Sequence, residues 1–368
     1  MKKSVGHAPP KPHKDTDNME NIYFLTGLLL FFALLLSWGF RHLPSERWQI
    51  MACVPLTKDK RGVWKGLNLT YYGLFSALAY GLGISLLFIL LGSAGVPFAG
   101  TVIITIVVLA CCVPASSIIA RFVERKPFTF SVGGASFVGI LIAPWVILCT
   151  DRVANHIMNV TIPLYPTLAA LSIAYAVGEG AGRLACISYG CCYGASLSES
   201  GPFLKRIFDR HHFVFTGTTK KIAYASNLDG VKVIPIQAVT SIIYILVAMV
   251  GIVLYLRQFF FPSFLIPLVA TQCWRVVSEF LRADYRGGGF ISAYQIMAIL
   301  SIAYASGLTF ILPSTGPVSV DIIKGISSLW NPVVILTLEV IVIAIFLYTG
   351  RSDMTASSIT FHIHDERL

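Results

Sequence analysis

Long apolar stretches recur along the whole of this 368-residue chain and constrain its fold more than any other feature. A helix needs roughly 20 apolar residues, at about 1.5 Å of rise each, to cross the hydrocarbon core of a bilayer. Only 12% of the residues are charged, against about a quarter in soluble proteins. The pattern predicts an all-α integral membrane protein with about nine transmembrane helices. We place these helices at residues 22–40, 70–94, 97–120, 132–150, 163–188, 236–256, 259–281, 290–312 and 330–349.

Polar segments separate the apolar stretches. Residues 1–21 contain four lysines and a Pro-Pro pair, and we expect a basic disordered arm there, because such a segment buries little apolar area. Residues 22–69 hold the first helix and a polar linker, and 313–368 hold the last helix and a tail. The longest polar stretch, 189–235, is predicted to form a small head on one face of the membrane.

The net charge of +10 does not make nucleic acid an expected partner. Basic residues of a membrane protein usually face anionic lipid headgroups. The basic arm places the N-terminus in the cytoplasm by the positive-inside rule, and counting spans then places the head outside. The outer segments are also rich in lysine and arginine, contrary to that rule, as expected if the outer face handles lipid.

The eight cysteines follow no metal or disulfide pattern. Four of them lie in apolar stretches, where cysteine usually packs as a small hydrophobic residue. Cys186, Cys191 and Cys192 are close in sequence, but their spacing is not that of a zinc site. We expect no metal site and no cofactor.

Ionisable residues within the predicted spans are candidates for function, since each costs several kcal/mol in the bilayer. Glu179 and Arg183 lie four residues apart, as do Arg275 and Glu279, and Arg282 is expected on the same helix face as the second pair. These residues could form internal salt bridges that hold the helices together. Two converging guanidinium groups also suit a phosphate, because the planar group donates two parallel hydrogen bonds to its oxygens.

Residues 178–194 are rich in glycine. Gly178 and Gly182 would let another helix approach closely, and Gly190 and Gly194 suit a turn where backbone N–H groups could meet an anion. Packing and a helix end would explain the same glycines. Glu339, in the last span, has no visible partner and fits a structural role as well as a functional one.

Six short motifs follow one another between residues 70 and 312. They are Tyr72-Gly73-Leu74, Gly133-Gly134-Ala135-Ser136-Phe137, Arg183-Leu-Ala-Cys186 leading to Gly190 and Gly194, Pro235-Ile236-Gln237, Arg275-Val-Val-Ser-Glu279-Phe-Leu-Arg282, and the segment from Gly289 to Gln295. In type and order they resemble the motifs of the bacterial prolipoprotein diacylglyceryl transferases. The resemblance implies a seven-helix transferase core at 70–312, which includes the head, and one additional helix at each end.

A transferase of this family moves the diacylglyceryl group of phosphatidylglycerol onto the thiol of a lipobox cysteine and releases glycerol phosphate. The resemblance implies that Arg183 and Arg275 bind the leaving phosphate and that Glu279 orients an arginine or acts as the base. It assigns substrate binding to Tyr72, Arg282, Gly194, Gln237 and Ser136. The implied partners are phosphatidylglycerol or a related anionic phospholipid and a preprolipoprotein signal peptide or another acceptor. The implied location is the bacterial cytoplasmic (inner) membrane, which the chain crosses several times.

The chain departs from the family pattern near the expected acceptor. Val138 replaces a histidine, Cys186 an asparagine and Cys191 an acidic residue, and Ile234 and Thr240 replace a histidine and a glutamate. A divergent member that transfers a phospholipid-derived group to a different acceptor is therefore an alternative. A non-enzymatic lipid transporter is another, although transporters usually consist of two pseudo-symmetric halves and no internal repeat is visible.

Overall fold

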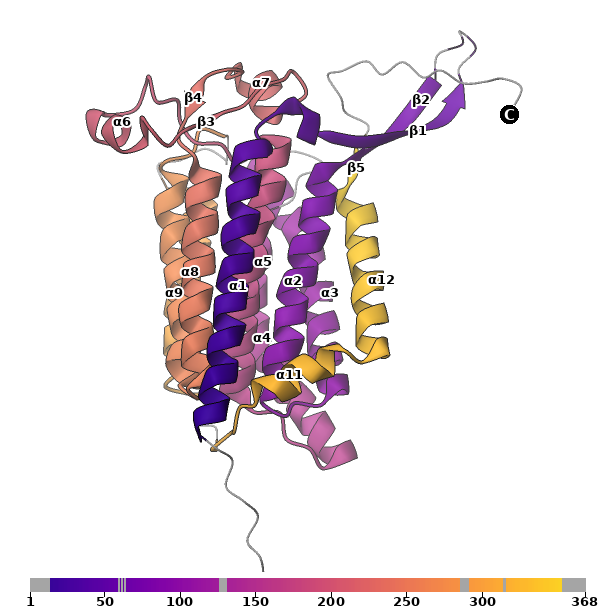
Figure 1. The fold of residues 1–368 in the computed structure, drawn as a ribbon, viewed down its shortest axis with the longest axis vertical. Helices are drawn as coiled ribbons and strands as arrows, with labels where there is room; N and C mark the ends of the chain where they lie inside the picture. The colour runs from indigo at the N-terminus through magenta and orange to yellow at the C-terminus, as the bar shows by residue number, and fades with distance from the viewer. Residues whose placement is uncertain are drawn as a thin grey trace, which may run out of the picture.

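The computed structural model describes residues 14–58, 60, 62, 64–125, 131–284, 291–313 and 316–352, and it is mostly helical (72%). Seven helices of the described chain are long and apolar enough to cross a membrane. They are α1 (Lys14–His42), α2 (Tyr71–Ser93), α3 (Phe98–Glu124), α4 (Val132–Met158), α8 (Ile236–Leu256), α9 (Phe260–Glu279) and α12 (Pro332–Thr349). The chain is thus a multi-pass membrane protein, built as an upright bundle (Figure 1).

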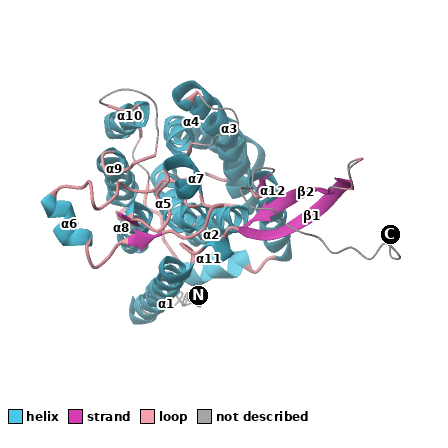
Figure 2. Cartoon of the chain, turned by 90° about the horizontal axis from the view of Figure 1, so that it is seen from above, coloured by secondary structure: helices cyan, strands magenta, loops and turns pink. Residues whose placement is uncertain are grey.

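Two further helices, α5 (Leu164–Tyr189) and α10 (Ala293–Leu308), run beside these seven. Viewed from above, α5 lies in the middle of the bundle (Figure 2), where it packs against α2, α8 and α9. Most of its residues are buried. Protein therefore surrounds α5 on most sides, and its small and ionisable residues face other helices.

Each of the nine predicted spans overlaps one helix of the described chain. The number of membrane crossings nevertheless stays a prediction, because α10 has only 16 residues and α5 is not among the seven helices that are long and apolar enough to cross a membrane. Helix α1 begins at Lys14, inside the segment predicted to be a disordered arm. The rest of that arm, residues 1–13, lies outside the described residues.

The all-α prediction missed a small antiparallel sheet of order β1-β2-β5. Its strands are β1 (Ile50–Lys58), β2 (Trp64–Thr70) and β5 (Arg351–Ser352). Thr70 Oγ1 donates a hydrogen bond to the carbonyl of Gly350 at 3.0 Å. The linker after α1 is therefore joined to the chain that follows α12, and α12 packs on α2.

Residues 190–235 form a layer over one end of the bundle, which we call the head end (Figure 1). This layer contains α6 (Pro202–Phe208), β3 (Phe213–Val214), α7 (Lys221–Ser226) and β4 (Lys232–Val233). The start of α1 and the short helix α11 (Ile322–Leu329) lie at the opposite end.

A buried lysine fixes the head layer to the bundle. Lys220 is fully buried, and its ammonium donates hydrogen bonds to the carbonyls of Leu43 and Ser188. Leu43 directly follows α1, and Ser188 lies in the last turn of α5. Burial lowers the pKa of Lys220 to about 7. These hydrogen bonds therefore connect the head layer to the ends of α1 and α5.

Candidate functional site

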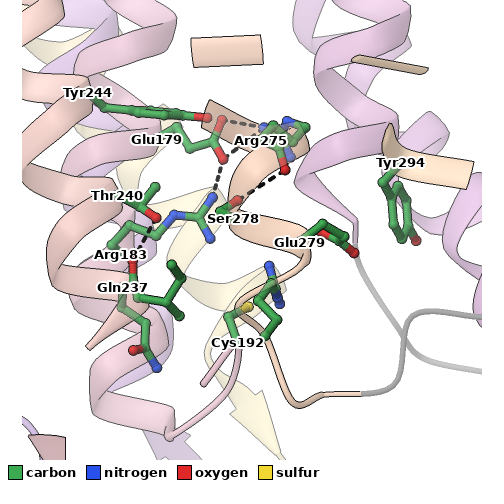
Figure 3. Close-up of a pocket in the computed structure, with 12 residues that line it drawn as sticks. Glu179, Arg183, Cys192, Gln237, Thr240, Tyr244, Arg275, Ser278, Glu279 and Tyr294 are labelled. Atoms are coloured by element: carbon green, nitrogen blue, oxygen red, sulfur yellow. Dashed lines mark hydrogen bonds and ion pairs between the residues drawn. The ribbon is translucent and has the colours of Figure 1, made fainter. Parts of the chain in front are cut away.

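A narrow crevice lies at the head end of the bundle, between α5, α8, α9 and the start of α10 (Figure 3). The volume of the crevice is only about 20 Å³. Its ionisable lining residues are Glu179, Arg183, Cys192, Arg275, Glu279, Arg282, Tyr244 and Tyr294. Five of the predicted site residues thus lie in one place, although Arg183 and Arg282 are 99 positions apart along the chain. The five are Arg183, Gln237, Arg275, Glu279 and Arg282.

Helix α5 carries Glu179 and Arg183 into the crevice because its small residues pack on α2. A β carbon on Gly178 would lie 3.6 Å from the carbonyl oxygen of Ala79, and one on Gly182 would lie 3.7 Å from the β carbon of the same residue. The glycines therefore lie against α2, as the small-residue pattern predicts. Glu179 and Arg183 are left on the side of α5 that faces the crevice.

Glu179 bridges two arginines. Arg183 donates a hydrogen bond to Glu179 Oε1 within α5, and Arg275 Nη2 lies 2.8 Å from Oε1 and 2.6 Å from Oε2. Arg275 Nη2 also donates to the hydroxyl of Tyr175 at 2.8 Å. All three ion-pair side chains are largely buried. One carboxylate therefore holds two guanidinium groups at the centre of the bundle.

This arrangement corrects the predicted pairing of the charged residues. The sequence spacing predicted an Arg–Glu pair within each helix, but among the described residues only Glu179 and Arg183 form one. Arg275 reaches across to α5 and pairs with Glu179. Glu279 lines the crevice without an ion pair to any described residue. Packing of α9 against α5 decided which carboxylate Arg275 meets.

Arg282 also differs from its predicted position. Helix α9 ends at Glu279, so Arg282 lies in the following turn and not on the helix face of Arg275. Its Nε and Nη2 donate to the two carboxylate oxygens of Asp284 at 2.8 and 2.7 Å. The guanidinium of Arg282 still reaches the crevice.

Gly194 places the backbone of Arg282 and does not contribute to the described crevice lining. The two residues form a β-bridge, flanked by a hydrogen bond from Ala195 N–H to the carbonyl of Leu281 at 3.0 Å. A β carbon on Gly194 would lie 2.4 Å from the carbonyl oxygen of Ile234. Only glycine allows this approach, so Gly194 positions the backbone of Arg282. Its role in substrate binding stays a prediction.

Four buried polar atoms at the crevice have no hydrogen-bond partner among the described residues. They are Nε of Arg183, Nε of Arg275, Oε1 of Gln237 and Oε1 of Glu279. Gln237 is held by its other amide atom, since Nε2 donates to the carbonyl of Cys191 at 2.9 Å. A buried polar atom left without a partner costs about 1–3 kcal/mol. Two donors and two acceptors in one crevice therefore suit ordered water or a polar ligand.

Tyr72 and Ser136, predicted to bind substrate, do not line the described crevice. The ring of Tyr72 packs on Tyr189 with centroids 5.5 Å apart, and Ser136 Oγ donates to the carbonyl of Gly133 at 3.0 Å. Gly133 of the same motif lies against the site, because a β carbon there would lie 3.2 Å from Arg275 Nη1. The motif therefore brings α4 against Arg275 through its glycine.

Several residues of the site were not predicted. The hydroxyl of Tyr175 accepts from Arg275, and Tyr244 and Tyr294 line the crevice. Tyr175 precedes Glu179 by four residues, so a search for polar groups on the same face of α5 could have found it. Asp284 follows the end of α9 and had no sequence signal beyond its charge.

Three cysteines meet at the edge of the crevice. The Sγ atoms of Cys186, Cys191 and Cys192 all lie within 4.8 Å of one another, although their spacing predicted no such cluster. Glu339, in contrast, lies on the exposed outer face of α12.

Neither a scan of known protein families nor a search of curated proteins finds a match to this chain. The relation to diacylglyceryl transferases therefore stays a proposal that depends on the six motifs and on the residues of the crevice.

Proposed function

We propose that this chain is a membrane transferase that moves the diacylglyceryl group of phosphatidylglycerol onto the lipobox cysteine of a preprolipoprotein. The observation that carries the proposal is the meeting of Arg183, Arg275 and Arg282 in one crevice whose buried polar atoms lack partners. Their order along the chain matches that of the family motifs.

The charge balance at Glu179 suits a phosphodiester. Two guanidinium groups share one carboxylate, which leaves one positive charge on this cluster. A phosphodiester carries one negative charge and would offset it. Glu179 also holds the two arginines through Nη2, so Nε of each is available to the phosphate oxygens. Buried arginines held in place by a carboxylate lose little freedom when they bind.

The reaction is a displacement at the glyceryl carbon that carries the phosphate. The acceptor sulfur forms a bond to this carbon, the carbon–oxygen bond breaks, and glycerol phosphate leaves with the electron pair. Arg183 and Arg275 stabilise the negative charge on the leaving phosphate. Glu279 is the base of this proposal, because it is the crevice carboxylate without an ion pair to the described residues.

The location of the crevice fits a lipid donor. It lies at the ends of α5 and α9 and at the start of α8, where a phospholipid headgroup would meet the protein. A bacterial cytoplasmic membrane is the matching compartment for this proposal.

A related transferase with another acceptor is the second candidate. Val138 stands where the family has a histidine, and it does not line the described crevice. Cys186 and Cys191 replace an asparagine and an acidic residue near the same place. A pocket built for a thiol needs polar groups that match it, since unpaired groups select against the wrong acceptor.

Complementation tests the proposal. In a bacterial strain depleted of its own diacylglyceryl transferase, we expect this gene to restore some lipoprotein modification, and Arg275→Lys to abolish the restoration. Growth no better than with the empty vector would contradict a lipobox acceptor. Rescue that appears only with Val138→His, alone or with Cys186→Asn, would favour the second candidate.

A further inference from the structure

The end of α5 folds three cysteines into one cluster. Gly190 ends the helix with a φ of 69°, and Cys191 N–H donates to the carbonyl of Cys186 at 3.0 Å. Cys192 then adopts a φ of 57°. These two left-handed residues turn the chain back over the helix end. The three Sγ atoms therefore lie within 4.8 Å of one another.

We propose that Cys186, Cys191 and Cys192 bind a zinc(II) ion through three thiolates and leave its fourth position open to the crevice. Zinc with three protein ligands and one open position is the usual arrangement of a catalytic zinc site. Zn–S bonds of about 2.3 Å in a tetrahedron place the sulfur atoms about 3.8 Å apart. The cluster needs only a small contraction to reach this geometry. Cys192 itself lines the crevice (Figure 3).

The surroundings of the cluster suit a zinc–thiolate complex. Three thiolates and one zinc(II) carry a net charge of −1. Arg183, Arg282 and Lys221 are close enough to the cysteines to interact with them electrostatically. These cations would stabilise the negative complex.

The loop that carries the cysteines is also braced on both sides. Gln237 Nε2 donates to the carbonyl of Cys191 at 2.9 Å, and Ile222 N–H donates to the carbonyl of Gly190 at 3.0 Å. Contacts that orient the ligands of a metal site typically raise its affinity by 10- to 100-fold. The cysteine loop therefore has the support that a metal site requires.

The role of the zinc site depends on the proposed function. The acceptor thiol takes the fourth position as a thiolate, since a coordinating thiol is deprotonated. Its proton passes to Oε1 of Glu279, which is buried without a described partner, and then to water. The sulfur forms its bond to the glyceryl carbon, and glycerol phosphate leaves toward Arg183 and Arg275. The thioether product is a weaker ligand and leaves the metal. The site thus supplies the thiol activation that Val138 cannot.

Metal analysis tests the zinc site independently of any transferase activity. The full chain is purified in detergent without a metal-affinity tag, and zinc is measured by mass spectrometry. We expect about one zinc ion per chain in the wild type, and at least a fivefold loss in Cys191→Ser and in Cys192→Ser. The matched control is Cys149→Ser with Cys273→Ser, which changes two exposed cysteines of α4 and α9.

A measurement on the wild-type chain alone tests the site even if a cysteine variant fails to fold. Cobalt(II) exchanged into it should give thiolate-to-cobalt absorption. No bound metal after incubation with zinc, or a thiol titration that shows a disulfide among the three cysteines, would overturn the site.

A peptide titration separates the metal site from the proposed reaction. Adding a lipobox cysteine peptide to the cobalt-loaded protein should change the thiolate-to-cobalt absorption, and a serine peptide should leave it unchanged. A spectrum that the cysteine peptide does not alter would overturn the activating role. A cysteine-specific change without any lipid transfer would support the site and count against the proposed function.

Discussion

Arg275→Lys separates a phosphate-binding arginine from a structural one. Every hydrogen bond that Arg275 makes to Glu179 and Tyr175 uses Nη2, while its Nε is buried without a described partner. A lysine keeps one positive charge near Glu179 and loses the planar group that carries Nε. The change should therefore preserve most of the ion pair and remove the donor available to a ligand.

The magnitude follows from the lost contacts. A hydrogen bond to a charged group contributes about 1.5–3 kcal/mol, and one or two such bonds to phosphate would be lost. We expect kcat/KM to fall by about 10- to 10,000-fold, at 1.4 kcal/mol for each factor of ten. The unfolding free energy should fall by less than about 3 kcal/mol, because complete removal of one partner of a buried ion pair costs about 3–5 kcal/mol and lysine keeps the charge.

The assay compares transfer from labelled phosphatidylglycerol with thermal unfolding of the same preparation. Arg257→Lys is the matched control, since Arg257 is exposed beyond the far end of α8. Near-normal turnover of the Arg275 variant would refute the phosphate role. Activity that falls only in step with the folded fraction would show that Arg275 merely holds the bundle together.

Three more perturbations test neighbouring parts of the account. Glu279→Gln should lower turnover by about 100-fold or more, as expected for a lost general base, and leave binding of phosphatidylglycerol vesicles unchanged. Loss of lipid binding would instead show that Glu279 orients an arginine. Burial lowers the pKa of Lys220 to about 7, so the folded state loses this proton at a lower pH than the unfolded state. The unfolding free energy should therefore rise between about pH 7 and 10 by up to 1.4 kcal/mol per pH unit. Thermal unfolding of Lys220→Met should show a flatter rise with pH, and equal slopes for the variant and the wild type would contradict the assignment. Glu339→Leu should raise stability in bicelles by up to about 3 kcal/mol, because a charged residue facing lipid is costly; a decrease would reveal a partner for Glu339.

The helices could be predicted from the sequence because apolar length is a local property. The stretch at 236–256 coincides with α8, and that at 132–150 begins where α4 begins. The sheet could not be predicted in the same way. Its strand β2 pairs with Arg351 and Ser352, which are about 280 residues away along the chain. No local sequence pattern predicts the pairing of β2 with β5.

The candidate site was predictable only in part. Arg183 and Arg275 stood out because arginine is rare within apolar helices. Their shared partner Glu179 could not be predicted, since it depends on how α5 and α9 pack. Arg282 was misplaced because the spacing of seven from Arg275 continued a helix that ends at Glu279.

The cysteine cluster shows the limit of motif spacing. Zinc sequence motifs usually consist of two pairs of ligands, with two to four residues between paired cysteines. Four residues separate Cys186 from Cys191, but Cys192 follows directly and no second ligand pair lies nearby in the sequence. A left-handed residue at Gly190 ends the helix between them and reverses the chain. The sequence shows that glycine, but the direction of the reversal depends on contacts with Lys220 and Ile222.

Transfer by the purified protein tests the central claim most directly. Phosphatidylglycerol labelled in both its acyl chains and its headgroup is incubated with the protein and a lipobox cysteine peptide. We predict labelled diacylglyceryl on the cysteine and an equal amount of released glycerol phosphate, with neither product from a serine peptide or from Arg275→Lys. Binding of the lipid without release of glycerol phosphate, under conditions where the protein stays folded, would contradict the transferase and favour a lipid transporter.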